Sequence, residues 1–191
     1  MERELEVELV SRLRAGDTTA FDHIFATFNQ RILSFLTRMA RNRSVAEDLA
    51  EETWLRLVSG GDALRADTRL GPWLFTVARN LYVSYCRSRS REEAYTADLI
   101  LLWPAGLPQS PYQVAAMNEF EEHVEAAIAS LPPIYREALL LVGVEQLLPA
   151  DAAKVCGISP ESFRQRLSRA RAMMSRSLAN HTHKEWSRER S

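Results

Sequence analysis

The sequence predicts an all-α protein built from two small helical domains joined by a flexible linker. The chain has 191 residues, enough for one or two small domains that each bury a core. It holds only seven Gly and eight Pro, while the helix formers Ala, Leu, Arg and Glu recur throughout. Apolar residues return at helical spacing in several segments. We expect a front domain over 1–91, a linker over 92–111, a second domain over 112–178 and a tail over 179–191.

The first two helices are marked by the residues at their ends. Residues 2–14 carry a stripe of Leu, and Gly16 is placed to end this helix. Asp17 or Thr18 can cap the second helix, which keeps helical apolar spacing from residue 21 to 39. Both helices therefore present an apolar face to a common core.

Two further helices complete the front domain. The third is expected to start at an N-cap Ser44, with Glu47 completing a capping box, and to end at a Ser-Gly-Gly turn. A polar loop over 62–71 follows. Pro72 then opens the fourth helix, which runs to Arg87.

The linker is unusually apolar at Leu99-Ile-Leu-Leu-Trp103. Two interpretations stay open: this stretch packs on one of the domains, or it docks on a partner. Pro111 is expected to start a helix that reaches Ser130. Leu131-Pro-Pro then breaks that helix, and another runs from Ile134 to Val144.

The last third of the chain predicts a helix-turn-helix. Pro149 opens a short helix that ends at Cys156, and Gly157 supplies a left-handed turn. Ser159 caps the next helix and Pro160 takes its first position. Within that helix an apolar stripe must face the preceding helices, at Phe163, Leu167, Ala170 and Met174.

The opposite face of this helix has the geometry to enter a DNA major groove. Arg and Gln near the start of such a helix can hydrogen-bond base edges, and further Arg can bind phosphates. An Arg-rich solvated helix is the simpler alternative, but it does not explain the short helix, the Gly turn and the capped start together. The expected DNA-binding residues are Ser162, Arg164, Gln165, Arg166, Arg169 and Arg171.

A net charge of −1 is unfavourable for binding nucleic acid, but the charge is unevenly distributed along the chain. Residues 1–91 carry 14 Arg and Lys against 12 Asp and Glu, whereas 92–130 carry seven acids and no base. Residues 131–191 carry 10 bases and six acids. Two binding modules around an acidic connector fit this pattern. Because affinity for DNA rests largely on phosphate neutralisation, each module should bind DNA weakly alone.

Several other classes of protein are disfavoured. The start of the chain lacks the basic and apolar segments of a signal peptide, and no apolar run is long enough for direct membrane insertion. Cys86 and Cys156 lie far apart, which points to a reducing cytoplasm rather than a disulfide framework. No nucleophile–base pair or standard metal-ligand spacing is evident, so we expect no enzyme, cofactor, bound metal or small-molecule substrate.

Two sets of motifs, in order, resemble a known family. Leu131-Pro-Pro-Ile-Tyr-Arg-Glu-Ala-Leu-Leu-Leu141, Cys156-Gly-Ile-Ser-Pro160 and Arg164-Gln-Arg-Leu-Ser-Arg-Ala-Arg171 resemble the fourth region of sigma-70-type sigma factors. Ala46-Glu-Asp-Leu-Ala-Glu-Glu-Thr-Trp54 and Pro72-Trp-Leu-Phe-Thr-Val-Ala-Arg-Asn-Leu81 resemble their second region. Only these two regions occur, joined by a short connector, as in the extracytoplasmic-function (ECF) group. The resemblance covers roughly residues 18–178.

The resemblance implies a function, partners and residue roles. An ECF sigma factor binds core RNA polymerase, at the clamp helices of the large subunit and at the flap, and directs initiation at promoters with −10 and −35 elements. The polymerase-binding positions correspond to Asp48, Leu49, Glu51, Glu52 and Trp54. The −10 loop and helix correspond to Asp67, Thr68, Arg79, Asn80 and Arg87. The recognition helix would select the −35 element.

This chain departs from the family pattern at several positions. Leu64, Leu70 and Pro72 replace residues common in the −10 segment, so its base preference does not transfer. Leu148 stands where a capping Ser or Thr is usual, which should weaken the short helix by about 1 kcal/mol. The family also implies an anti-sigma partner, in many cases membrane-bound.

One alternative explains the last third equally well. A stand-alone helix-turn-helix transcriptional regulator would also need residues 131–178, but it leaves both front motifs unexplained.

Overall fold

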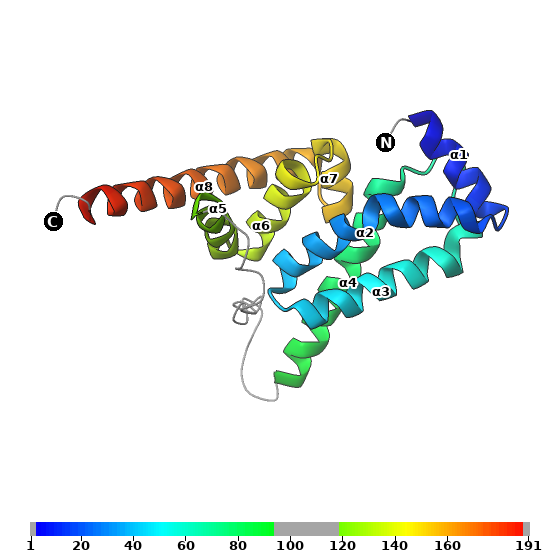
Figure 1. The fold of residues 1–191 in the computed structure, drawn as a ribbon, viewed down its shortest axis with the longest axis horizontal. Helices are drawn as coiled ribbons and strands as arrows, with labels where there is room; N and C mark the ends of the chain where they lie inside the picture. Colours follow the sequence, from blue (N-terminus) through cyan, green and yellow to red (C-terminus); the bar gives the residue numbers. More distant parts are fainter. Residues whose placement is uncertain (1–2, 94–118, 189–191) are drawn as a thin grey trace.

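The computed structural model describes residues 3–93 and 119–188, and every regular element within these ranges is helical. Figure 1 shows two groups of helices in contact, which we call the front half (α1–α4) and the back half (α5–α8). The predicted all-α fold class is confirmed. Residues 94–118 lie outside the described residues, so the expectations for the apolar linker and for a helix start at Pro111 are not addressed.

The front half contains four α-helices and one short turn of 3₁₀ helix. Its elements are α1 (Arg3–Arg14), α2 (Thr18–Ala40), α3 (Arg43–Gly60), η1 (Gly61–Ala63) and α4 (Leu70–Glu93). Gly16 has φ +78°, the left-handed conformation expected of it. Asp17 is the N-cap of α2, where its carboxylate accepts a hydrogen bond from the Thr19 amide at 2.8 Å.

The predicted cap of α3 is wrong. Asn42, not Ser44, caps the helix, because α3 already begins at Arg43 and the Asn42 side chain accepts from the Val45 amide at 3.2 Å. Glu47 pairs with Arg43 at 2.7 Å and therefore forms no capping box with Ser44.

Helix α4 starts two residues before Pro72 and ends six residues after Arg87. The early start has a non-local cause: the Leu70 amide donates to a carboxylate oxygen of Glu6, which comes from α1 (2.7 Å). A cap supplied from 64 residues away leaves no local signal in the sequence.

The back half contains the expected broken helix followed by the helix-turn-helix. Its elements are α5 (Glu119–Ser130), α6 (Pro133–Leu139), the π-helical turn η3 (Leu140–Val144), α7 (Pro149–Cys156) and α8 (Pro160–Arg188). Helix α6 begins at Pro133, one residue before the expected Ile134. Helix α8 continues into the segment expected as a tail and is the long helix that extends away from the molecule in Figure 1.

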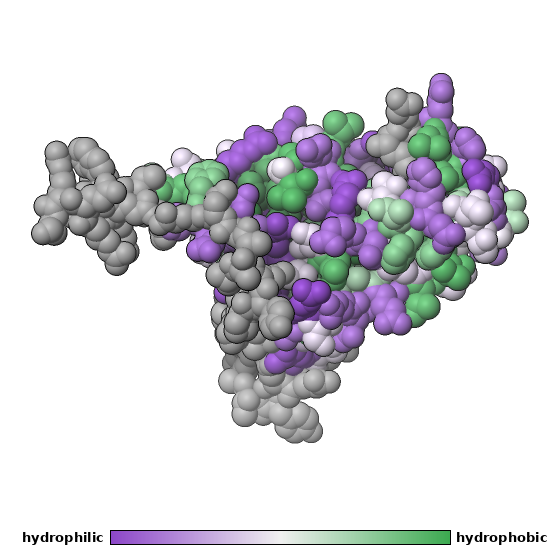
Figure 2. Space-filling model, viewed as in Figure 1, coloured by the Kyte–Doolittle hydropathy of each residue, from purple (hydrophilic) through white to green (hydrophobic). Residues whose placement is uncertain are grey.

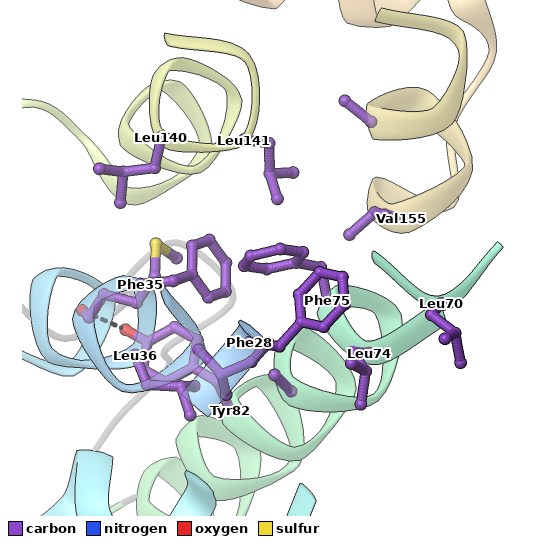
Figure 3. Packing of buried hydrophobic residues seen from close by; sticks show 14 of the residues in the cluster. Phe28, Phe35, Leu36, Leu70, Leu74, Phe75, Tyr82, Leu140, Leu141 and Val155 are labelled. Atoms are coloured by element: carbon purple, nitrogen blue, oxygen red, sulfur yellow. Dashed lines mark hydrogen bonds between the residues drawn. The ribbon is translucent and has the colours of Figure 1, made fainter. Parts of the chain in front are cut away.

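The two halves share one apolar core. Phe28, Phe35 and Phe75 come from α2 and α4, and they face Leu140, Leu141 and Val155 of the back half in Figure 3. The rings of Phe35 and Phe75 meet edge to face, with centroids 5.4 Å apart. This packing fixes the back half against one side of α2 and α4.

Candidate functional site

The helix-turn-helix forms as its end residues predict. Gly157 is left-handed (φ +66°) and closes α7, with its amide donating to carbonyls of the preceding turn. The Ser159 hydroxyl accepts from the Ser162 amide at 3.1 Å and so caps α8, in which Pro160 is the first residue. No side chain caps the start of α7 at Leu148, as expected.

The recognition helix buries one stripe and exposes the other. Phe163 and Ala170 are fully buried and Leu167 nearly so, against α6 and α7. Five of the six predicted DNA-binding residues are exposed, and Arg166 is half-buried. The six are Ser162, Arg164, Gln165, Arg166, Arg169 and Arg171.

The exposed face of α8 is not uniformly basic. Arg164 pairs with Glu161 at 2.5 Å, and Ser162 accepts a hydrogen bond from the Ser159 hydroxyl at 2.9 Å. Arg164, Gln165 and Arg169 line a shallow depression together with Glu161 and Ser168. Sequence reasoning left Glu161 and Ser168 out of the site, although helical spacing from Arg164 and Gln165 places them on the same face.

On α3, the predicted polymerase-binding acids lie on an outward face. Asp48 and Glu51 are exposed, and Glu52 is half-exposed and pairs with Arg56 at 2.8 Å. Leu49 is half-buried against the core. The carboxylates thus form a row that a basic or hydrogen-bond-donating partner can contact.

Trp54 differs from the acids because it lies mostly inside the fold. Its indole Nε1 donates to Asn29 Oδ1 at 3.0 Å, and its ring packs on Phe25, with centroids 4.9 Å apart. Its role in any contact is therefore to support the surface around it.

That surface is an open groove between α2 and α3. Leu55 is 54% exposed and Val58 is 64% exposed, although both are apolar. Phe21 and Phe25 line the groove with them, and the exposed acid Glu51 also lines it. Figure 2 shows hydrophobic residues reaching the surface over α2 and α3 at the right of the view. From the sequence, Leu55 and Val58 read as ordinary apolar positions of a helix, so their exposure was not foreseen.

The loop between η1 and α4 carries the predicted −10 residues Asp67 and Thr68. Asp67 is exposed, and Arg65 contacts its carboxylate at 2.9 and 3.2 Å. The Arg65 guanidinium holds the pKa of the Asp67 carboxyl below its ordinary value, so Asp67 is an ionised hydrogen-bond acceptor. Thr68 is half-buried, and its amide closes a turn onto the Arg65 carbonyl at 2.9 Å.

The predicted strand-binding residues of α4 differ in accessibility. Asn80 and Arg87 are exposed. Arg79 instead pairs with Glu137 of α6 at 2.9 Å, and its side chain is only 20% exposed. Arg79 Nη1 also reaches Asn80 Oδ1 at 3.5 Å, so Arg79 lies beside Asn80 but is held mainly by Glu137.

The residues that the structure describes contain neither a candidate metal site nor a candidate membrane-spanning helix. Within 3–93 and 119–188, no three His, Cys, Asp or Glu side chains gather as a metal site would require. In the same ranges no helix is both long and apolar enough to cross a membrane.

Two family models match this chain. One is described as Sigma-70 region 2 and covers residues 24–92; the other is described as Sigma-70, region 4 and covers residues 122–174. They fall on the front and back halves respectively.

Curated relatives give the same result. The chain is 37% identical over 142 residues to the ECF RNA polymerase sigma factor EcfG of Rhodopseudomonas palustris (strain TIE-1), a match covering 74% of this chain and 76% of that protein. It is 33% identical over 150 residues to the ECF RNA polymerase sigma factor SigM of Bacillus subtilis (strain 168), covering 78% and 90%.

Solved structures share the fold. The sigma factor RpoE of Bartonella quintana, in complex with the anti-sigma factor NepR, aligns with a TM-score of 0.68 at 26% identity, covering 83% of this chain and 96% of that one. CnrH, solved with the cytosolic domain of CnrY, aligns with a TM-score of 0.67 at 18% identity, covering 92% and 98%.

Proposed function

Because the chain belongs to the sigma-70 family of RNA polymerase sigma factors, in its ECF group, we propose that its two halves divide promoter recognition between them. In this division residues 1–91 bind core polymerase and the −10 element, and residues 112–178 bind the −35 element. The observation that best supports the division is that one chain exposes an acidic, partly apolar face on α3 and a capped, Arg-bearing helix α8.

The polymerase surface is the outward face of α3 with the adjoining groove. Asp48, Glu51 and Glu52 supply charge, and Leu55 and Val58 supply apolar area that is costly to leave in water. Acids around an apolar centre suit a partner surface that is both basic and apolar, and we assign that surface to the clamp helices of the large polymerase subunit. Trp54 and Leu49 support this face from beneath.

The −10 surface is the loop before α4 with the exposed part of that helix. Asp67 can accept hydrogen bonds from the edge of a flipped base, and Thr68 can donate or accept. Asn80 and Arg87 lie on α4, where the opened strand would continue. Arg79 lies beside Asn80, and its guanidinium would bind the strand in full only after it separates from Glu137.

The −35 surface is the start of α8. Gln165 and Arg169 lie beside Arg164 on its exposed face, in the position from which a recognition helix reads the major groove. Arg166 and Arg171 add positive charge toward the phosphates. We assign the core-polymerase flap to the same half, as the resemblance implies.

An anti-sigma factor is the proposed regulator. RpoE of Bartonella quintana was solved bound to NepR, and the present chain aligns with most of it. An anti-sigma that occupied the α2–α3 groove would exclude polymerase directly. We place promoter recognition by this chain in the bacterial cytoplasm. This function requires no catalysis, cofactor or metal from the chain.

The first test is transcription by core polymerase with and without this chain, on duplex and on pre-melted promoter templates. We expect initiation only when the chain is present, because it supplies the promoter contacts. Tight specific binding to duplex DNA without polymerase would instead support a stand-alone regulator, and failure to bind core polymerase would refute the proposal.

A second test separates the two surfaces. Arg166→Ala with Arg169→Ala should reduce promoter-specific initiation while core binding persists, since both belong to the proposed −35 surface at the start of α8, whereas Arg176 lies further along the same helix. Leu55→Ala with Val58→Ala should instead weaken binding to core polymerase, which fluorescence anisotropy measures. Arg176→Ala and Val7→Ala are the matched controls, because each removes an exposed side chain of the same kind elsewhere.

A further inference from the structure

Helix α1 lies before the residues matched by the region 2 family model, yet it holds the proposed −10 loop in place. The Arg3 guanidinium donates to the Asp67 backbone carbonyl at 2.8 Å. The Glu6 carboxylate accepts from the Leu70 amide at 2.7 Å through one oxygen, and pairs with Arg3 at 3.3 Å through the other. Arg3 and Glu6 thus form one connected unit that spans the end of the loop.

Glu6 acts as a cap supplied from another helix. Leu70 is the first residue of α4, so its amide has no acceptor within the helix. A carboxylate at this end is also favoured by the helix dipole. Glu6 is buried, and a buried carboxylate is tolerated only when its oxygens are hydrogen-bonded.

The other end of the loop region also rests on α1. Leu13 packs so closely on Gly61, in η1, that a Cβ there would lie 3.3 Å from the Leu13 side chain. Residues 61–70 are therefore held by α1 at both ends. Between these contacts the backbone forms two turns, closed by the Leu64 amide on the Gly61 carbonyl and by the Thr68 amide on the Arg65 carbonyl.

The contacts from α1 do not engage the side chains proposed to read the base. Arg3 binds the carbonyl of Asp67 and not its carboxylate, which is 66% exposed. Glu6 binds a main-chain amide. The anchors therefore fix the backbone while the side chains of Asp67 and Thr68 remain the outward groups of the loop.

We propose that Glu6 and Arg3 are positioning residues for −10 recognition: they hold the 64–69 loop in the conformation that receives a flipped base. The idea rests on the proposed function of that loop. Its physical reason is preorganisation, because a loop already in its bound shape does not lose conformational freedom when the base enters. Neither residue touches the DNA base in this assignment.

The test uses holoenzyme assembled on core polymerase and the single-stranded non-template −10 segment of a promoter that it transcribes. The variants are Glu6→Ala, Glu6→Gln and Arg3→Ala, and the control is Glu8→Ala, which removes an exposed acid of the same helix. Fluorescence anisotropy gives the affinity for the −10 strand and for a strand with the −10 bases replaced. Affinity for core polymerase is measured separately.

Glu6→Ala should weaken binding of the −10 strand by about fivefold to tenfold, a typical effect of a lost helix cap. Glu6→Gln should recover most of that loss, because its amide oxygen still accepts from Leu70. Binding of the replaced strand and of core polymerase should change little. Arg3→Ala, at a partly exposed position, should produce the same selective loss without endangering the fold.

A double variant distinguishes positioning from a general effect on stability. If Glu6 acts through the loop, Glu6→Ala should cost less once Thr68→Ala has removed one of the two reading groups. Additive losses, or equal losses on both strands, would overturn the inference and leave the proposed function standing. Failure of the unsubstituted holoenzyme to prefer the −10 strand would instead overturn the proposed function.

Discussion

Arg136 is a buried cation that joins the ends of two helices from different halves of the molecule. It is 5% exposed, and burial followed by the nearby charge of Arg41 lowers the pKa of its guanidinium. Helix C-termini present unpaired carbonyls and the negative end of the helix dipole, which suits a planar five-donor group. The carbonyls that accept from it belong to Ile128 and Ala129 in the last turn of α5, to Leu131 directly after it, and to Arg38 and Met39 in α2.

Replacing Arg136 should therefore be costly. Arg136→Met keeps the volume but leaves several buried carbonyls without donors, and we expect the free energy of unfolding to fall by about 3 kcal/mol or more. Arg136→Lys should cost less, because one ammonium can still satisfy some of them. Urea denaturation measures both, with the exposed Arg176→Met as control. A loss no larger than that of the control would contradict this account.

Both cysteines are buried, and burial disfavours the ionisation of their thiols. Burial raises the pKa of both thiols. At Cys156 the carboxylate of Glu137 raises the pKa further, because it lies against the sulfur (Sγ to Oε2, 3.4 Å). The thiolate is the reactive form, so a raised pKa suppresses reaction. Both thiols ionise less readily folded than unfolded, so their contribution to stability is present below the unfolded pKa of about 8.5 and declines as pH rises above it.

Alkylation tests this directly. At pH 8 iodoacetamide should modify Cys86 and Cys156 slowly in the folded protein and rapidly after addition of denaturant, as followed by mass spectrometry. Ser175→Cys provides an exposed thiol as the positive control. Labelling of Cys156 as fast as that of this control would show that its surroundings are not as described.

At the scale of elements, local chemistry predicts local features. The ends of α7 and the start of α8 follow from Pro149, Gly157 and Ser159, all within a few residues of what they determine. The start of α4 depends on Glu6, and no pattern near residue 70 reveals a cap that comes from α1. The choice between Asn42 and Ser44 is a different case, since both residue types are good N-caps. Which of them caps α3 depends on the residue at which the backbone becomes helical, and that is Arg43.

The start of α7 offers a test of capping. Leu148 occupies the N-cap in an extended conformation (φ −61°, ψ 141°), makes no side-chain cap and is 60% exposed. Leu148→Ser should raise the free energy of unfolding by about 1 kcal/mol, because its hydroxyl can accept from an amide of the first turn. Leu148→Ala is the matched control, since it also shortens the side chain but supplies no acceptor. Equal stability of the two variants in thermal denaturation would refute the capping explanation.

For the whole molecule, the contact between the halves is both apolar and charged. Beside the shared core of Figure 3, arginines of the front half pair with acids of the back half. Three of these acids, all except Glu125, are buried. The pairs are Arg31 with Glu145, Arg38 with Glu125, Arg69 with Asp151 and Arg79 with Glu137.

This arrangement could not be predicted from the sequence. Charge counts identify a mildly basic front and an acidic middle, but Glu137, Glu145 and Asp151 lie in the net basic last third. Their pairing depends on how the halves dock, which neither periodicity nor motifs encode. It also explains why Arg79, which the resemblance assigns to the −10 helix, is only 20% exposed.

If the 64–69 loop and α4 receive the opened strand as proposed, we expect the halves to separate before promoter binding. Arg69 precedes α4 directly and Arg79 lies on it, so both belong to the surface proposed for the opened strand. In this structure Arg69 is paired with Asp151 and Arg79 with Glu137, so neither guanidinium is free to pair with a phosphate. Weakening this contact should therefore favour the form that can bind DNA.

Glu137→Gln with Asp151→Asn should open the molecule, because each substitution removes the charge that balances a partly buried arginine. Loss of one partner of a buried pair costs about 3 kcal/mol, and less at Arg69 because its side chain is 44% exposed. Fluorescence energy transfer between one dye on α3 and another on α8 should fall, and the radius of gyration from X-ray scattering should rise. Glu8→Gln with Glu161→Gln is the matched control, since these exposed acids pair only within their own helices. Unchanged transfer and radius in the double variant would mean that the apolar core alone holds the halves together, and that polymerase or DNA must separate them against it.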